Sequence, residues 1–344
     1  MPLNAAYARF MDTLFSHRTA LSLLRDPTLE AWSRPTNGEL LRAPASPADS
    51  FTARDLLREN SALRRAGEPL EFLSSDPNGA RVGNGFISHV WAGDLPMGSV
   101  TDIGHGLFCS SAKMVALQLA TSITELELVA LLCEFMGTYS IAPGLAGGMS
   151  NRPVALCGPE DLKKFLDACV GRRGVKSLRR AGGLAFFGSA SPRETKLALR
   201  LCLPAVKKGY GLKLLSMNEP VEVERIGGHL RGRGIRKPDI LIAPWPGSGA
   251  GPVAVEYDGE ESHMTREGVL SDTKRGNELK AMGIGEYRVN RELYRNIDYM
   301  DDLVFKIREE AGYPRRHRSA ADGYRLKLRH LELYRELERV SGIF

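Results

Sequence analysis

The sequence predicts an α/β protein with two folded domains: a smaller α+β N-terminal domain and a C-terminal core with the element order αβββαβ. The chain has 344 residues, enough to bury two separate cores. In its N-terminal half, short extended runs precede helices. Its C-terminal half opens with a strongly capped helix, continues with strands bounded by Pro and Gly, and closes with a helix, a strand and a helix.

The composition is that of an ordinary globular protein, with 43% hydrophobic and 26% charged residues. The chain contains no run of about 18 apolar residues, and its N-terminus lacks a signal-peptide pattern, so we expect no membrane association and a cytoplasmic location. The five cysteines are scattered and form no C-x-x-C pair. We therefore expect reduced packing residues, and neither a disulfide nor a zinc framework.

Four segments follow from the pattern of elements and turns. Residues 1–75 predict helices, one of them from Thr52 to Ala66. They are interpreted as a loose N-terminal helical arm, with an adaptor for a partner as the alternative. Residues 76–181 predict a β-unit between Ala80 and Ser111, followed by two helices. A domain boundary is expected at Gly182-Gly183, so that residues 182–312 form the C-terminal domain and residues 313–344 a charged helix.

Capping signals locate the helices of these segments. Thr124 with Glu127 three residues later forms a capping box, and Pro159 marks the first turn of the next helix.

His89 belongs to the predicted β-unit, and the sequence offers it no metal-binding partner, so an exposed or hydrogen-bonded core histidine is the favoured interpretation.

The C-terminal domain begins with the clearest helix start in the chain. Ser191 is the expected N-cap and Pro192 the first helical residue. Glu194 completes a capping box, and this leaves two interpretations open: its carboxylate bonds back to the helix start, or it faces a functional site.

The most informative stretch is a pair of short strands with acids at their ends. Asp239 opens the apolar run Ile240-Leu241-Ile242, while Glu256 and Asp258 interrupt the end of the run that starts at Val253. Paired as a hairpin, the strands bring the three carboxylates together, and such groups repel one another unless a cation binds between them. Hard oxygen ligands favour Mg²⁺ or Mn²⁺. The alternative is a hairpin whose acids are simply solvated.

These motifs resemble the core of the PD-(D/E)XK nuclease superfamily, and in particular the branch similar to very-short-patch-repair endonucleases. The resemblance rests on Pro238-Asp239, on Glu256-Tyr257-Asp258-Gly259 with His263, and on the downstream order Asp272, Arg275, Leu279 and Gly283. It implies a restriction-endonuclease-like fold over roughly residues 185–312, a Mg²⁺ cofactor and DNA as partner. It also implies a metal-shell role for Glu194, a catalytic role for His263 and phosphate binding by Arg275. The chain departs from the superfamily at Asp258, where Lys is common.

A second resemblance is weaker in detail. The order of β-unit, Cys-Ser-Ser turn and apolar helix over residues 80–170 is similar to the middle portion of abortive-infection type IV antitoxins. In some bacterial proteins that portion precedes a nuclease-like domain. This resemblance implies a role in bacterial defence.

Charge distribution points to the same partner. The chain carries 47 basic and 41 acidic residues, and one basic cluster, which includes Arg233, Arg236 and Lys237, leads directly into Asp239. Phosphate backbones are the natural ligand of such a patch. The predicted helix from Ala320 to Val340 has an apolar stripe that would pack on the body or on a second copy, giving a homodimer.

Two functional hypotheses follow, beside a third possibility, an interaction protein assembled through the C-terminal helix. In the first, the protein is a metal-dependent endonuclease acting in defence or repair, in which Asp239 and Glu256 bind the metal and Asp258 is a further ligand or a water-orienting base. His263 would activate the water or protonate the leaving oxygen. In the second, the protein is a non-catalytic, antitoxin-like DNA-binding regulator that keeps a nuclease fold.

Overall fold

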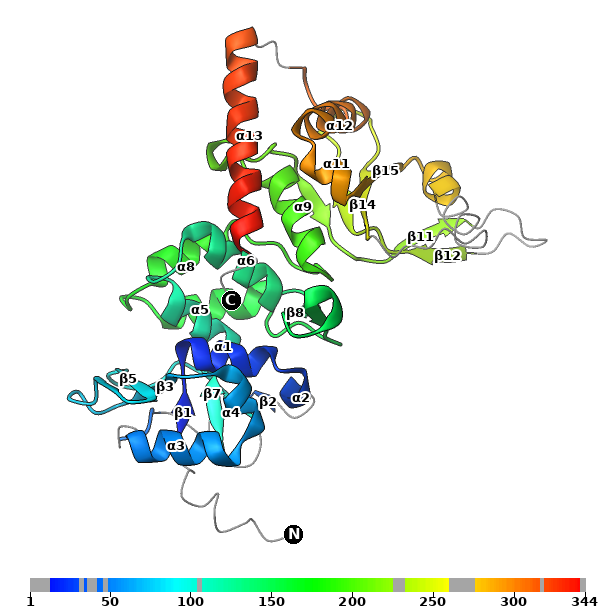
Figure 1. Cartoon of the computed structure of the whole chain (residues 1–344). Helices are drawn as coiled ribbons and strands as arrows, with labels where there is room; N and C mark the ends of the chain where they lie inside the picture. Colours follow the sequence, from blue (N-terminus) through cyan, green and yellow to red (C-terminus); the bar gives the residue numbers. More distant parts are fainter. Residues whose placement is uncertain are drawn as a thin grey trace. The chain divides into compact units, whose positions relative to one another are not determined.

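The computed structural model of the chain describes residues 13–30, 34–35, 42–45, 49–103, 107–224, 233–259, 276–315 and 319–340. Within these residues the protein is a mixed α/β structure with several sheets, in agreement with the predicted class. It divides into two compact units (Figure 1). Unit 1 comprises Met1–Met136 and Ser140–Ala185, and unit 2 comprises Gly137–Tyr139 and Phe186–Phe344.

Unit 1 is built on a mixed sheet whose described strands run in the order β2-β6-β7-β1-β3-β5-β4. The strands are β1 (Leu14–Phe15), β2 (Arg34–Pro35), β3 (Leu70–Ser74), β4 (Arg81–Gly83), β5 (Phe86–Val90), β6 (Val100–Asp102) and β7 (Phe108–Ser110). Strand β1 lies antiparallel to β3 and parallel to β7, and β3 lies parallel to β5. The β-unit predicted from Ala80 to Ser111 is thus part of a larger sheet.

The described helices of unit 1 either lie between these strands in the sequence or follow the last of them. They are α1 (His17–Arg25), α2 (Pro27–Glu30), α3 (Ser50–Glu59), α4 (Ser61–Ala66), α5 (Ala112–Leu119), α6 (Glu125–Phe135), α7 (Pro159–Ala168) and α8 (Val175–Gly182). Helix α6 begins with the predicted capping box of Thr124 and Glu127, and α7 begins at Pro159 as predicted. A short ladder pairs β8 (Tyr139–Ile141) with β9 (Met149–Asn151).

The structure differs from the sequence-based interpretation of the first 75 residues in two respects. The described N-terminal residues are not a loose arm, because β1 is an inner strand of the sheet and Leu14 and Phe15 are 1% and 0% exposed. The helix predicted from Thr52 to Ala66 is two helices. Asn60 separates them, since its side chain accepts hydrogen bonds from Ala62 N and Leu63 N and so caps α4.

Unit 2 contains a four-stranded sheet with the order β10-β13-β14-β15. Its elements are α9 (Pro192–Cys202), β10 (Leu214–Ser216), β11 (Val221–Glu224), β12 (Arg233–Arg236), β13 (Ile240–Ile242), β14 (Val253–Asp258), β15 (Gly285–Asn290), α11 (Arg291–Arg295), α12 (Ile297–Glu310) and α13 (Ala320–Val340). Residues 276–281 are also helical. Strands β10, β13 and β14 are successively antiparallel, and β15 lies parallel to β14.

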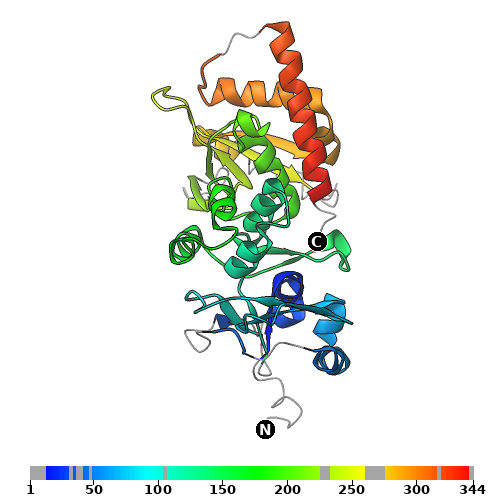
Figure 2. The ribbon, with the colours of Figure 1, turned by 90° about the vertical axis from the view of Figure 1, so that its left-hand side faces the viewer.

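Each face of this sheet has its own apolar cluster. Ile240, Val255 and Val289 face a cluster that includes residues of α9 and α12, and Figure 2 shows these helices from a second direction. Leu241 and Ala254 face the opposite way, toward Val223 of β11, Leu279 and Ile284. These sets alternate along the strands, as expected for a sheet buried on both faces.

One strand assignment in this unit is corrected by the structure. Residue type and spacing predict two strands before the hairpin, from Tyr210 to Leu215 and from Val221 to Ile226, as the start of the αβββ core. Instead β11 pairs with β12 in a separate two-stranded ladder, and β10 is the neighbour of β13. The burial pattern gives the reason: of the four residues in β11, only Val223 is buried, so this strand cannot fill a central position.

Helix α13 has the predicted bounds and packs on α9 and α12. Leu333 and Leu337 are buried, and His330 Nδ1 lies 3.0 Å from Asp301 Oδ1 of α12. Toward its N-terminal end, Tyr324 and Leu328 are exposed. The apolar stripe therefore covers unit 2 itself, and the homodimer stays a prediction. Across the described ranges, no helix combines the length and the apolar character needed to cross a membrane.

Candidate functional site

The predicted hairpin of unit 2 forms with a register that brings Asp239 next to Glu256. Ile240 lies opposite Val255 in the antiparallel pair of β13 and β14, so the preceding Asp239 falls opposite Glu256. The contact is fixed by a hydrogen bond, because the Tyr257 backbone N–H donates to Asp239 Oδ2 at 2.7 Å. Side chains directly opposite in such a pair have Cβ atoms roughly 4.5–5.5 Å apart. Two of the three predicted carboxylates are thus neighbours.

The alternation of β14 adds the third carboxylate to the same face. Glu256 and Asp258 are two residues apart and follow Ala254, whose side faces Leu279 and Val223. Glu256 is only 5% exposed, whereas Asp258 is partly exposed. The acids therefore form a row that runs from the covered part of this face toward solvent.

Strand β15 contributes two further charges that the sequence interpretation did not assign to the site. Arg288 lies opposite Glu256 in the parallel register, and Arg288 Nη1 is 3.7 Å from Asp258 Oδ1. Arg288 Nε also donates to Glu286 Oε1 at 3.0 Å. Because Glu286 and Arg288 are two residues apart on β15, both project from one side of the strand. The row of acids thus has an arginine within it.

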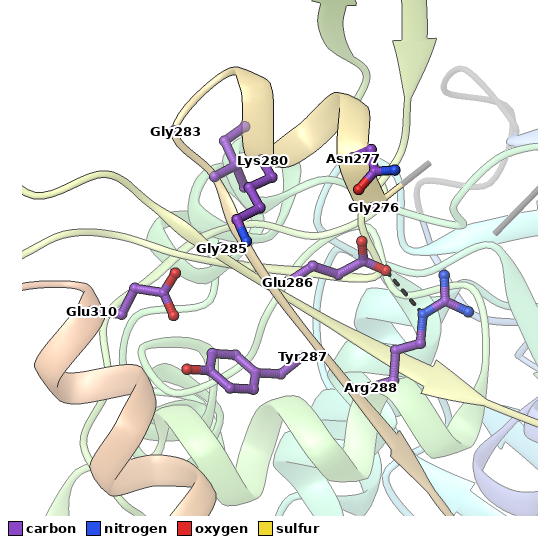
Figure 3. Close-up of a pocket in the computed structure, with 10 residues that line it drawn as sticks. Gly276, Asn277, Lys280, Gly283, Gly285, Glu286, Tyr287, Arg288 and Glu310 are labelled. Atoms are coloured by element: carbon purple, nitrogen blue, oxygen red, sulfur yellow. Dashed lines mark hydrogen bonds and ion pairs between the residues drawn. The ribbon is translucent and has the colours of Figure 1, made fainter. Parts of the chain in front are cut away.

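A cavity of about 770 Å³ opens beside this edge of the sheet (Figure 3). Its lining includes Glu286 and Arg288 from β15 and Asn277 and Lys280 from the helical residues 276–281. Figure 3 shows the carboxylate of Glu286 directed toward the Arg288 guanidinium. The cavity therefore carries both signs of charge and borders the strand that pairs with the acidic end of β14.

A partly buried ion pair holds the helical residues 276–281 on this face of the sheet. Glu278, which is 3% exposed, accepts a hydrogen bond of 2.8 Å from Arg236 Nε and a second bond from Arg236 Nη2. The pair joins β12 to the helical residues 276–281, which also contribute Leu279 to the apolar cluster beneath. Arg236, predicted to bind nucleic acid, therefore holds this carboxylate, whereas Arg233 is exposed on the same strand near Glu222.

Glu194 is used at the start of α9, though not in the way a capping box requires. Ser191 Oγ accepts a hydrogen bond from the Glu194 backbone N–H, as an N-cap should. The Glu194 carboxylate accepts instead from Ala190 N at 2.9 Å and from Asn218 Nδ2 at 2.7 Å. The Asn218 N–H in turn donates to the carbonyl of Pro238, directly before Asp239. Glu194 is thus linked to the acidic row through Asn218.

Two of the predicted site residues, His263 and Arg275, lie outside the described residues. Lys237 lies between β12 and Asp239, as the sequence requires. The residues that sequence reasoning missed are Glu286, Arg288, Asn277 and Lys280. The alternation of Glu286 and Arg288 was visible in the sequence, but their position beside Glu256 depends on the parallel register of β14 and β15.

Comparison with protein-family models, with curated proteins and with solved structures finds no match for this chain.

Asn218 offers a test of how the site is supported. Its backbone φ is +52°, a left-handed conformation that Gly adopts freely and Ala does not. We expect Asn218→Ala and Asn218→Gly both to lose about 1–3 kcal/mol of unfolding free energy, because the buried Glu194 carboxylate loses its amide donor. Asn218→Ala should be less stable than Asn218→Gly by roughly a further 1 kcal/mol. Denaturant titration measures both, and equal stability of the two variants would contradict this account.

Proposed function

We propose that the protein is a metal-dependent endonuclease that hydrolyses phosphodiester bonds in DNA, and that unit 2 has a restriction-endonuclease-like core. The observation that carries this proposal is the opposition of Asp239 and Glu256 on one face of the sheet, with Asp258 two residues further along β14. The order of elements supports it: α9, the antiparallel strands β10, β13 and β14, a helical segment, and the parallel strand β15 follow the αβββαβ pattern.

The donor set fits a hard divalent cation. Asp239, Glu256 and Asp258 offer only carboxylate oxygens, which Mg²⁺ and Mn²⁺ prefer over nitrogen or sulfur ligands. A cation of this kind supplies a hydroxide near neutral pH and neutralises charge on the reacting phosphate. Asp239 and Glu256 are the proposed ligands, with Glu194 completing the shell through water. Asp258 is a third ligand or orients the attacking water.

The chain's own residues would then handle the proton and the phosphate. His263 takes the proton of the attacking water or donates one to the departing oxygen. Arg288, beside Asp258 at the edge of the row, binds a non-bridging phosphate oxygen through its planar guanidinium. This arginine supplies the positive charge that the superfamily usually takes from the Lys replaced here by Asp258.

A regulator that binds DNA without cutting it is the second candidate. The observation that favours it is the contact between Arg288 and Asp258, since an arginine held among the acids can replace a metal as their counter-charge. The two candidates differ in one measurable property, which is metal-dependent cleavage.

Cleavage of supercoiled plasmid and of single-stranded DNA, with and without Mg²⁺ or Mn²⁺, tests the proposal. We expect metal-dependent cutting by the wild type and its loss in Asp239→Asn and Glu256→Gln, because each substitution removes a charged ligand without changing side-chain size. His263→Gln should lower the rate by roughly 10²–10⁴-fold. Glu222→Gln, an exposed acid on β11, is the matched control and should cut normally. Salt-sensitive DNA binding without cutting in any of these metals would favour the regulator.

The two arginines of β12 should separate DNA binding from stability. Arg233→Gln should leave unfolding unchanged within about 0.5 kcal/mol, because this side chain is exposed. If Arg233 contacts one phosphate, the slope of log K against log salt should fall by about 0.9. Arg236→Gln should instead destabilise unit 2 by about 1–3 kcal/mol, since Glu278 is left buried without its partner. An unchanged salt slope for Arg233→Gln would remove this residue from the interface.

A further inference from the structure

Three metal-ligating side chains meet in unit 1, in a part of the chain that the proposed nuclease chemistry does not use. Glu71 is on β3, His89 is on β5, and His17 begins α1, with one residue between it and the end of β1. Strand β3 lies between β1 and β5 in the sheet. The Ser16 N–H donates to the Glu71 carbonyl at 2.8 Å, so His17 is held next to Glu71. Glu71 and His89 share one face because Leu73, two residues after Glu71, is the register partner of His89.

The ligand atoms of these residues converge on one point. His89 Nε2 is 2.7 Å from Glu71 Oε2, and His17 Nδ1 is 4.0 Å from the same oxygen. The two imidazole rings are stacked, with centroids 3.6 Å apart and an interplanar angle of 25°. One ligand atom from each residue lies within 4.8 Å of the others. Ligand atoms around a tetrahedral zinc ion are roughly 3.3 Å apart, so an ion would draw these three ligand atoms closer together.

The surrounding bonds hold the ligands in position. The His17 backbone has φ +46°, and its N–H donates to Gln118 Oε1 at 2.9 Å. The Glu71 N–H donates to Thr19 Oγ1, and Glu71 Oε1 accepts from the Arg18 N–H. Backbone and side chain of Glu71 are thus both fixed, which leaves Oε2 directed at the two imidazoles.

We propose that His17, Glu71 and His89 bind a zinc ion that cross-links the start of α1 to strands β3 and β5. Two imidazole nitrogens and one carboxylate oxygen are a donor set that zinc takes in proteins, with the fourth position left for water. This donor set differs from the all-oxygen set of unit 2, so the two sites select different metals.

Burial and access both suit such a site. The His89 side chain is 31% exposed, compared with 11% for Glu71. The His89 side of the cluster is therefore more open to solvent than the carboxylate. Without an ion, the same residues form a hydrogen-bonded cluster, and the experiment must separate these two states.

The test is Zn²⁺ and Co²⁺ binding to the full chain after treatment with a chelator, in the background Asp239→Ala/Glu256→Ala, which removes the acidic site of unit 2. Calorimetry should give one Zn²⁺ per chain, and Co²⁺ should produce a visible absorption band typical of low coordination number. Glu71→Gln and His89→Gln should each weaken Zn²⁺ binding at least about tenfold. Glu59→Gln, on α3 of the same unit, is the matched control and should bind as before.

The outcomes are distinct. Zinc X-ray absorption on the loaded protein should report two imidazole ligands, and this readout holds even if Glu71→Gln or His89→Gln fails to fold. Absence of stoichiometric binding would overturn the proposal, as would binding of unchanged affinity in folded Glu71→Gln and His89→Gln. Because the background variant lacks the proposed nuclease ligands, either result is independent of whether the protein cuts DNA.

Discussion

The register between β13 and β14 is the constraint on which the candidate site depends. It sets Asp239 opposite Glu256, and the Tyr257 N–H bonded to Asp239 Oδ2 continues the ladder by one residue beyond the last backbone pair. A slip of one residue would turn Glu256 and Asp258 to the face occupied by α9 and α12, where an unpaired carboxylate is costly to bury. The buried positions Val253 and Val255 exclude that slip, so the apolar packing fixes the position of the acids.

Around this row, the polar groups are supported from separate elements. The ion pair of Arg236 and Glu278 holds the helical residues 276–281 on the acidic face of the sheet. Asn218 connects Glu194 at the start of α9 to the carbonyl before Asp239. Arg288 reaches the row from β15. The charged groups in and beside the row thus have hydrogen-bond or ion-pair partners on separate segments, which restricts their side-chain motion.

Local signals in the sequence predicted much of unit 2. The cap of Ser191 and Pro192, the hairpin ending in acids, the final strand and the bounds of α13 follow from residue type and spacing, which act over a few residues. What the sequence could not supply is long-range. The exclusion of β11 from the core sheet and the position of Arg288 beside Asp258 depend on pairing between distant strands. The cluster of His17, Glu71 and His89 was missed for the same reason, because its members are joined by a sheet and not by sequence spacing.

The most direct test of the central claim is a crystal structure of the protein grown with Mn²⁺, with an anomalous difference map calculated at the manganese edge. The account predicts a peak bound by the carboxylates of Asp239 and Glu256, with Asp258 turned from Arg288 toward the ion or its water. An ordered Asp239 and Glu256 with no peak between them, and with Arg288 still on Asp258, would contradict it.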